Sequence, residues 1–310
     1  MFVQTKGAGN IQKYDFGLQY AAGRNQFVLT SGSAEMGRMF KTLGKLLNCN
    51  TPLLFQGDPG VGKKTWARIA HQASKQSQYR LTRFDCAALD AAKFYQTLAA
   101  ATNSEPDTVD CKPGMDVFDG TILLNRVEQL SAQMQALLLK VFREKILSLP
   151  GEPAVLINAR VIASSTYDLQ RLMQRGIYDR DLYYRLSVYT FRLPVLAERA
   201  VDVPAFVEYF SRIYAHKKQS HIHSFSNEAI EILQGNTWRH NLTELRETVI
   251  RSIAAGNGQE RITRVQWEMC ADRQQSESNA AISQLADEHE VTAKSPRRAF
   301  PLRALPNFSE

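Results

Sequence analysis

The sequence predicts an α/β fold in which a three-layer domain with a parallel sheet is followed by a smaller helical part. Two observations lead to this prediction. From Ser31 to about Pro194, short β-like runs alternate with helical segments, as in sheets whose two faces are covered by helices. From about Val195 to Cys270, apolar residues recur only at helical spacing.

The bulk composition is that of a globular chain. Its 310 residues suffice for one large domain with a subdomain or for two modest domains, and 44% of them are hydrophobic. No apolar run approaches the roughly 20 residues that cross a bilayer, so we expect no membrane-spanning segment. The first twelve residues also lack the apolar stretch of a secretory signal.

The cysteines and the net charge narrow the class further. The four cysteines Cys49, Cys86, Cys111 and Cys270 are widely separated and form no CxxC pair. Structural zinc and a disulfide framework are therefore not expected, and a reducing cytoplasm fits best. The formal charge of +7 is compatible with nucleic-acid binding or with a solvated surface, and its dispersal along the chain favours the surface.

The elements of the α/β part can be placed in order. Residues 1–30 are weakly patterned, and we expect one strand and an arm there. An amphipathic helix is predicted around Leu130–Val141, where apolar residues follow helical spacing. Runs of β-forming residues predict strands at Pro52–Gln56, Arg80–Asp85, Thr121–Leu124, Ala159–Ala163 and Val188–Leu193.

Capping residues mark the helices of the second part. Ser226 is a predicted N-cap and Gly235 a predicted stop for one helix. Asn241 and Glu244 have the spacing of a capping pair that opens another. Residues 271–310 are polar and then interrupted by prolines, so we expect a tail with one short helix around Ala280–Glu288.

A glycine-rich segment between a predicted strand and a predicted helix is the strongest motif. Glycines there let backbone N–H groups converge on phosphate oxygens, and the helix N-terminus adds its positive dipole. Lys63 supplies a point charge between the outer phosphates, which predicts a nucleoside triphosphate as the ligand. The alternative is a plain glycine-rich turn. The run is Gly57, Asp58, Pro59, Gly60, Val61, Gly62, Lys63, Lys64 and Thr65.

The signal for magnesium is weaker than the signal for phosphate. The Ser or Thr that holds this ion usually follows the P-loop lysine directly, but Lys64 occupies that position. Thr65 comes one residue later, about 100° further around the helix, and is a poor substitute. Magnesium therefore stays undecided at this point.

From about Gly32 to Ser252, the chain resembles the AAA+ domain of bacterial enhancer-binding proteins, the sigma-54-dependent transcription activators. The matching stretches include GDPGVGKKTWARIAHQAS, FDCAAL, DGTILLNRV, RVIASSTYDL, DLYYRLSVYTFRLPVLAERAVDVP and TWRHNLTELRETV, in the family's order. The resemblance implies a AAA+ P-loop NTPase core at residues 31–194 and a helical lid at residues 195–270. Residues 1–30 would then be an N-terminal arm and residues 271–310 a tail.

The departures from the family pattern lie where the chemistry is. The family's Walker B strand ends in Asp-Glu, which orders the magnesium shell and polarises the attacking water. Here Asn125 and Arg126 occupy those positions. Arg126 would pair with a phosphate, or the two residues would simply cap a strand; both interpretations predict poor hydrolysis.

Other positions that the resemblance marks as functional are altered as well. Asp85 stands where an Asn relays the nucleotide state, and Thr166 replaces a sensor Asn. In the lid, Thr243 replaces an arginine that would contact phosphates. Of two arginines that reach a neighbouring subunit, one position holds Asp179. The other keeps Arg185, as a trans arginine finger or as a structural ion-pair partner.

Two partner-binding features of the family are not matched. The GAFTGA loop that engages sigma-54 has no counterpart between Leu89 and Asp119, which argues against that contact. Residues 271–310 show no helix-turn-helix pattern, which argues against a DNA contact.

Three functional hypotheses follow. The first is a regulatory subunit that holds nucleotide, hydrolyses it slowly or not at all, and assembles into a homo- or hetero-oligomeric ring with a related activator. The second is an active ATPase that uses an unusual carboxylate, such as Asp85, Asp119 or Glu128. The third is a scaffold or DNA-binding accessory protein in which the P-loop is a relic.

Overall fold

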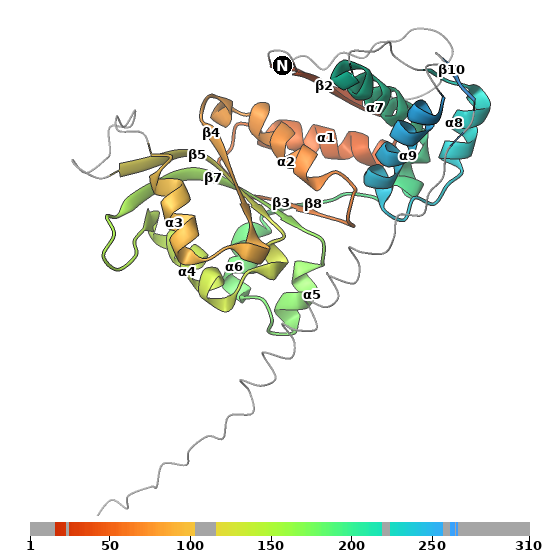
Figure 1. The fold of residues 1–310 in the computed structure, drawn as a ribbon. Helices are drawn as coiled ribbons and strands as arrows, with labels where there is room; N and C mark the ends of the chain where they lie inside the picture. The colour runs from red at the N-terminus through yellow and green to blue at the C-terminus, as the bar shows by residue number, and fades with distance from the viewer. Residues whose placement is uncertain are drawn as a thin grey trace, which may run out of the picture. The chain divides into compact units, whose positions relative to one another are not determined.

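The computed structural model describes residues 16–22, 25–102, 116–218, 224–256, 261–263 and 265. Its centre is a six-stranded sheet in which five parallel strands follow the order β4-β5-β7-β3-β8 (Figure 1). The short strand β6 (Ile146–Leu147) pairs with β7 in the antiparallel sense. The parallel strands are β3 (Leu53–Gln56), β4 (Arg80–Asp85), β5 (Asp116–Asn125), β7 (Val155–Ser165) and β8 (Tyr189–Arg192).

All five strands predicted from the sequence are confirmed, but β5 and β7 begin earlier than their apolar runs indicated. The two strands pair over their whole shared length, from Asp116 opposite Val155 to Asn125 opposite Ser164. Their amino-terminal halves contain polar residues that satisfy one another, since Asn158 Nδ2 donates to Asp119 Oδ1 at 2.7 Å. Such cross-strand pairs stabilise a sheet without any apolar signal in the sequence.

Helices cover both faces of the sheet, which gives the three layers that the sequence predicted (Figure 1). Helices α1 (Ala34–Leu46) and α2 (Lys63–Gln72) share one apolar core with Leu123 of β5. Its neighbours Ile122 and Leu124 point to the other core, because successive strand residues face opposite sides. That second layer consists of α3 (Ala91–Ala99), α4 (Ala132–Glu144), α5 (Leu169–Gln174) and α6 (Arg180–Leu186).

The segment before α1 contains two strands where the sequence predicted one strand and an arm. Strands β1 (Phe16–Ala22) and β2 (Asn25–Ser31) pair in the antiparallel sense, with Phe16 opposite Ser31 and Ala22 opposite Asn25. Residues 1–15 lie outside the described part of the chain, as does the predicted helix at Ala280–Glu288.

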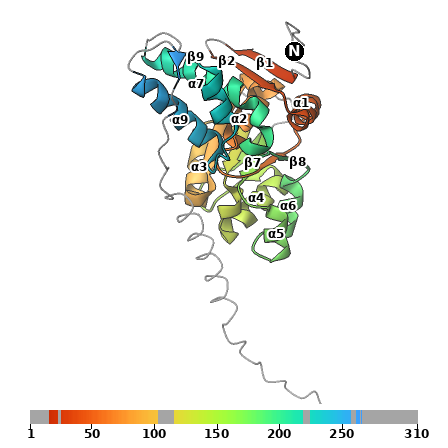
Figure 2. The same ribbon diagram turned by 90° about the vertical axis from the view of Figure 1, so that its right-hand side faces the viewer.

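A helical lid follows the sheet (Figure 2). It begins with the 3₁₀ segment η4 (Leu196–Asp202) and continues with α7 (Val203–Lys218), α8 (Asn227–Gln234) and α9 (Asn241–Ala255). The short strands β9 (Ser224–Phe225) and β10 (Arg261–Ile262) pair beside them. These elements share an apolar core that includes the buried Trp238.

The caps of the lid helices confirm some of the capping residues that we predicted from the sequence. The Ser226 hydroxyl accepts the Ala229 N–H, and α8 ends at Gly235, both as predicted. Glu244 does reach back to the start of α9, where its Oε2 accepts the His240 N–H at 2.9 Å. Asn241 does not act as the other half of a capping pair; its side chain bonds outside the helix.

Within the described residues, every helix is too short or too polar to cross a lipid bilayer.

The register of the sheet gathers the functional positions at one edge. Asp85 at the end of β4 lies opposite Asn125 at the end of β5, and Asn125 lies opposite Ser164 of β7. Gln56 at the end of β3 lies opposite Ser165 on one side and Arg192 on the other. Ligands of open α/β sheets bind at this carboxyl edge.

Candidate functional site

The loop after β3 has a backbone shape that needs its glycines. Gly57, Gly60 and Gly62 have φ angles of 146°, 81° and 103°, a region that other residues rarely adopt. A Cβ on Gly57 would lie 2.7 Å from the carbonyl oxygen of Leu193, so even an alanine does not fit there. Gly57 is therefore required both for its backbone conformation and for the space that a side chain would occupy.

Helix α2 leaves its first N–H groups free. Its N-cap is Gly62, which has no side chain to accept them, whereas Ser or Asp side chains cap α3, α4, α5, α6 and α8. Among the described residues, the N–H groups of Gly60, Gly62, Lys63 and Lys64 have no hydrogen-bond acceptor. Free donors at a helix N-terminus are a ready binding site for an anion such as phosphate.

Lys63 completes the positive environment of the loop. Its ammonium donates to the carbonyl oxygens of Gly57 at 2.5 Å and of Asp58 at 2.9 Å, which holds the charge over the loop. Burial lowers the pKa of Lys63 to about 8, although the negative charges of Glu128 and Asp58 oppose that shift. A bound phosphate would add a further negative charge beside the ammonium and favour its protonated form.

At the end of β5, Asn125 is buried and its amide is already engaged. The Nδ2 group donates to the carbonyl oxygen of Phe84 at 3.2 Å, and the Ser164 hydroxyl donates to Oδ1 at 3.4 Å. The side chain thus ties β5 to the strands on either side. It offers no carboxylate at the position where the resembled family has an Asp.

Arg126 turns away from the sheet and pairs with Asp85. It has left-handed dihedral angles, φ 59° and ψ 50°, and it donates from Nε and Nη2 to the two Asp85 oxygens at 2.9 and 2.5 Å. Burial raises the pKa of Asp85, but the Arg126 and Ala87 hydrogen bonds outweigh it and leave the pKa below its usual value. Within the described residues, the Arg126 guanidinium is thus engaged by the carboxylate of Asp85.

Glu128 is the carboxylate that the structure brings to the phosphate-binding loop. It is buried in the 3₁₀ segment η3 (Val127–Gln129), and its Oε1 accepts the Thr166 N–H at 3.2 Å. In the described part of the chain, its Oε2 is buried without a hydrogen-bond partner. Burial raises the pKa of Glu128; hydrogen bonds from its own N–H, from the Thr166 N–H and from the Ser165 hydroxyl lower it, and the Lys63 ammonium lowers it least.

The other two carboxylates named as alternatives are elsewhere or engaged. Asp85 is held by Arg126, as described above. Asp119 bonds Asn158 and lies six residues before Asn125 on β5, roughly 20 Å away at the usual strand rise. Of the three candidates, only Glu128 lies close enough to Lys63 for each to shift the other's pKa.

The lid touches the phosphate-binding loop directly. The Leu242 N–H donates to the Gly60 carbonyl at 3.1 Å, and Asn241 Nδ2 donates to the Pro59 carbonyl at 2.9 Å. Asn241 Oδ1 accepts the Leu196 N–H at 2.7 Å, so this side chain joins the loop to the start of the lid. Thr243 lies here too, with its hydroxyl 3.2 Å from where a Gly60 Cβ would be, but it carries no charge for a phosphate.

Arg199 is a residue of the site that we did not predict. It is 2% exposed, and its Nη2 donates to the Val61 carbonyl at 2.9 Å, while its guanidinium lies 5.6 Å from the Phe206 ring centre. A buried arginine therefore fixes the tip of the loop against the lid. The one sequence signal for it was its place in the matching stretch LPVLAERAVDVP.

The two positions that the resemblance marks as trans-acting lie at the start of α6 and in its last turn. Asp179 is the N-cap of this helix, since its Oδ1 accepts the Leu182 N–H at 2.8 Å. Arg185 is exposed in the last turn and makes no ion pair within the described residues. The structural ion pair that was its alternative role is not found there.

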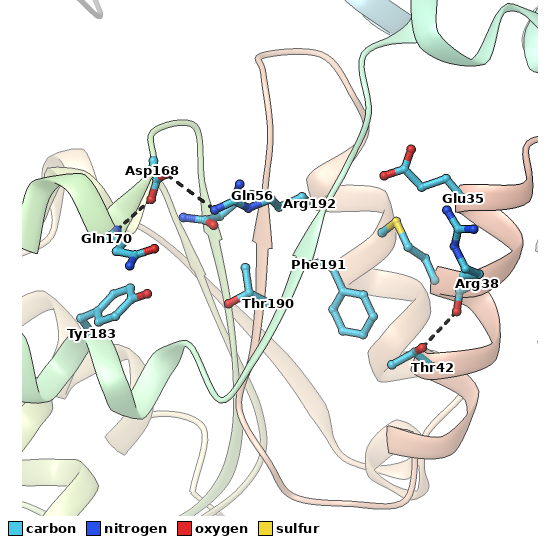
Figure 3. Close-up of a pocket in the computed structure, with 11 residues that line it drawn as sticks. Glu35, Arg38, Thr42, Gln56, Asp168, Gln170, Tyr183, Thr190, Phe191 and Arg192 are labelled. Carbon is cyan, nitrogen blue, oxygen red and sulfur yellow. Dashed lines mark hydrogen bonds and ion pairs between the residues drawn. The ribbon is translucent and has the colours of Figure 1, made fainter.

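A separate hollow of about 460 Å³ lies beside the edge strand β8. Figure 3 shows Glu35 and Arg38 of α1 on one wall and Asp168 on the other, with Arg192 of β8 reaching toward Asp168. The Arg192 guanidinium lies 3.7 Å from the Asp168 carboxylate. None of the residues predicted for phosphate binding lines this hollow.

Comparisons with known proteins match this architecture. The family model of the sigma-54 interaction domain matches residues 29–192, and that of the AAA+ ATPase lid domain matches residues 197–283. The transcriptional regulatory protein ZraR of Klebsiella oxytoca is 27% identical over 238 residues, which cover 76% of this chain and 54% of the relative. The DNA-binding transcriptional regulator NtrC of Rhizobium meliloti is 28% identical over 242 residues, covering 76% and 49%.

A solved structure shows the same fold. NtrX from Brucella abortus, crystallised in complex with ADP, superimposes with a TM-score of 0.64 at 22% identity, over 84% of this chain and 62% of NtrX. At that identity the likeness concerns the fold alone. The chain spans about half the length of the curated relatives named above.

Proposed function

Because this chain belongs to the sigma-54 interaction domain family of AAA+ proteins, we propose that it binds ATP or ADP and hydrolyses it slowly or not at all. It acts as a regulatory subunit in the control of transcription. The observation that carries this proposal is the contrast between an open phosphate-binding loop and a strand end without carboxylates. Four N–H groups of the loop have no acceptor within the described residues and Lys63 lies over the loop, while Asn125 and Arg126 are bonded to neighbouring residues.

The chemistry of hydrolysis needs groups that these two residues do not supply. A hydrolytic water must be oriented and deprotonated, and the charge of the leaving phosphate must be stabilised. The Asn125 amide is held between strands, and the Arg126 guanidinium cannot accept a proton. ATP bound here is therefore retained rather than turned over.

The regulatory role rests on assembly with a related activator in a AAA+ ring, in the cytoplasm. Arg185 is exposed on α6 and serves the nucleotide site of a neighbouring subunit. The partner subunit supplies the sigma-54 contact, because the segment between Leu89 and Asp119 lacks the GAFTGA motif.

Nucleotide binding and ATPase turnover test this proposal together. We expect the pure protein to bind ATP, Lys63→Ala to lose that binding, and Lys140→Ala, a change of an exposed lysine on α4, to keep it. Turnover of the pure protein should stay far below about 1 s⁻¹, the low end of ordinary enzyme rates. Turnover at or above that rate would show that the protein is an active ATPase.

The regulatory part needs a second measurement. Mixed with a related activator, the protein should change the activator's turnover, and Arg185→Ala should weaken that effect while leaving ATP binding intact. An unchanged activator rate at every mixing ratio would remove the co-assembly model.

A further inference from the structure

We infer that Glu128 binds a divalent cation together with the phosphates of the nucleotide, in place of the two carboxylates missing at the end of β5. The inference rests on the proposed nucleotide binding and adds a metal site to it. Its basis is the position of one buried side chain with an unused oxygen.

The backbone turn at Arg126 places Glu128 inside the protein. Left-handed dihedral angles at Arg126 send its side chain outward to Asp85 and start the 3₁₀ segment that carries Glu128. Glu128 is only 5% exposed, and the Thr166 N–H fixes its Oε1. Its Oε2 has no partner among the described residues, which is costly for a buried carboxylate oxygen unless a ligand satisfies it.

Glu128 follows the carboxyl end of β5, on the same edge of the sheet as the phosphate-binding loop after β3. The carboxylates that act on the Lys63 ammonium are those of Glu128 and Asp58, and Glu128 has the larger effect. Asp58 is exposed on the loop, whereas Glu128 is buried at the carboxyl edge of the sheet. The Thr166 N–H that bonds Glu128 is at the position where the resembled family has a sensor Asn.

The surrounding residues leave Glu128 as the available ligand. Asp85 is engaged by Arg126, and Asn125 Nδ2 and Oδ1 bond Phe84 and Ser164. Nowhere in the described ranges do three or more His, Cys, Asp or Glu side chains gather as a complete metal site. The cation must then take its other ligands from phosphate and water, as Mg²⁺ commonly does with one or two carboxylates.

The negative charge of Glu128 should make ATP binding depend on a divalent cation. Without a cation, an ionised and buried Glu128 repels the triphosphate, because like charges in a poorly solvated site are strongly unfavourable. With a divalent cation between them, both the carboxylate and the phosphates gain a shared partner. ATP binding should therefore depend on the cation through this one side chain.

Calorimetry of ATP binding, in Mg²⁺ and in EDTA, tests the assignment. For the wild type we expect Mg²⁺ to strengthen binding at least about tenfold, the scale on which changes around metal sites act. Glu128→Gln keeps an acceptor for the Thr166 N–H but removes the charge. It should lose the Mg²⁺ effect and bind metal-free ATP more tightly than the wild type does.

Two matched variants separate the possible failures. Asp119→Asn changes a different buried carboxylate, which lies on β5, and should keep the wild-type ratio of the two affinities, whereas Lys63→Ala should weaken binding in both buffers. If Glu128→Gln keeps the wild-type ratio, the metal assignment is wrong and the proposed nucleotide binding stands. If the wild type binds ATP in neither buffer, the proposed function fails and the metal site with it.

Discussion

The guanidinium of Arg126 binds both carboxylate oxygens of Asp85, and this ion pair joins the carboxyl ends of β5 and β4. The two residues occupy positions where the resembled family has a catalytic Glu and a relay Asn. Two departures that look independent in the sequence are thus partners in the structure. The side chains at the ends of β4 and β5 are therefore bonded to each other.

The pair itself should contribute little to stability. Its side chains are 44% and 51% exposed, and exposed ion pairs are worth about 0–1 kcal/mol. Arg126→Ala and Arg126→Gly both remove it, but only glycine relaxes the left-handed backbone. We expect Arg126→Gly to be more stable than Arg126→Ala by about 1 kcal/mol, measured by urea unfolding.

Lys145 provides the matched control for that measurement. It has the same φ of 59°, ends α4 and is exposed, so Lys145→Gly should exceed Lys145→Ala by a similar amount. If glycine is more stable than alanine at position 145 but not at position 126, the Arg126 turn relaxes when the ion pair is lost.

Restoring the missing carboxylates should create ATPase activity. The combination Asn125→Asp, Arg126→Glu and Asp85→Asn returns both acids and removes the carboxylate that would repel the new Glu. Because a positioned general base is worth on the order of 10²-fold or more, turnover should rise by at least that factor over the wild type. Steady-state phosphate release measures it, with Lys63→Ala in the same background as the inactive control. No increase would place the block at Thr166 or Thr243 instead.

The contact between loop and lid should fail when Gly60 gains a side chain. Gly60 has a φ of 81°, and a Cβ there would lie 2.2 Å from the His240 carbonyl oxygen, which is backbone. Gly60→Ala should therefore weaken ATP binding and lower stability. Gly151→Ala is the control: its φ is 80° but nothing lies within 4 Å, so it should cost only the backbone strain of about 1–2 kcal/mol. Equal costs at the two sites would show that the lid yields freely.

The affinity for ATP should fall in alkaline solution. Phosphate binds the protonated form of Lys63, whose pKa in the free protein is about 8. The affinity should be level below that pH and drop above it by up to about tenfold per pH unit, the slope of one proton. The unliganded protein should change in the opposite sense, because a lowered lysine pKa makes folding more favourable as the pH rises from about 8 toward 10.5.

Calorimetry between pH 7 and pH 10 would follow the affinity, and Lys63→Ala should show a level, weak profile. A wild-type slope that survives in this variant would assign the proton to another group.

Much of this protein could be determined from the sequence, because the signals are local. The five strands were predicted from short runs of β-forming residues, and the phosphate-binding loop is a contiguous glycine pattern placed between a strand and a helix. The loss of the Asp-Glu pair was visible as two adjacent letters. Features of this kind depend on neighbours within a few residues, which the sequence displays directly.

The tertiary structure decided which side chains from distant parts of the sequence contact each other. Arg126 and Asp85 are 41 residues apart, Glu128 and Thr166 are 38 apart, and Asn241 and Pro59 are 182 apart. The sequence does not show which carboxylate will pair with a given arginine, or which carboxylate will be buried with one oxygen that has no hydrogen-bond partner. Strand order and the turn at Arg126 determine both, because they set which strand ends lie together and which way each side chain leaves the sheet.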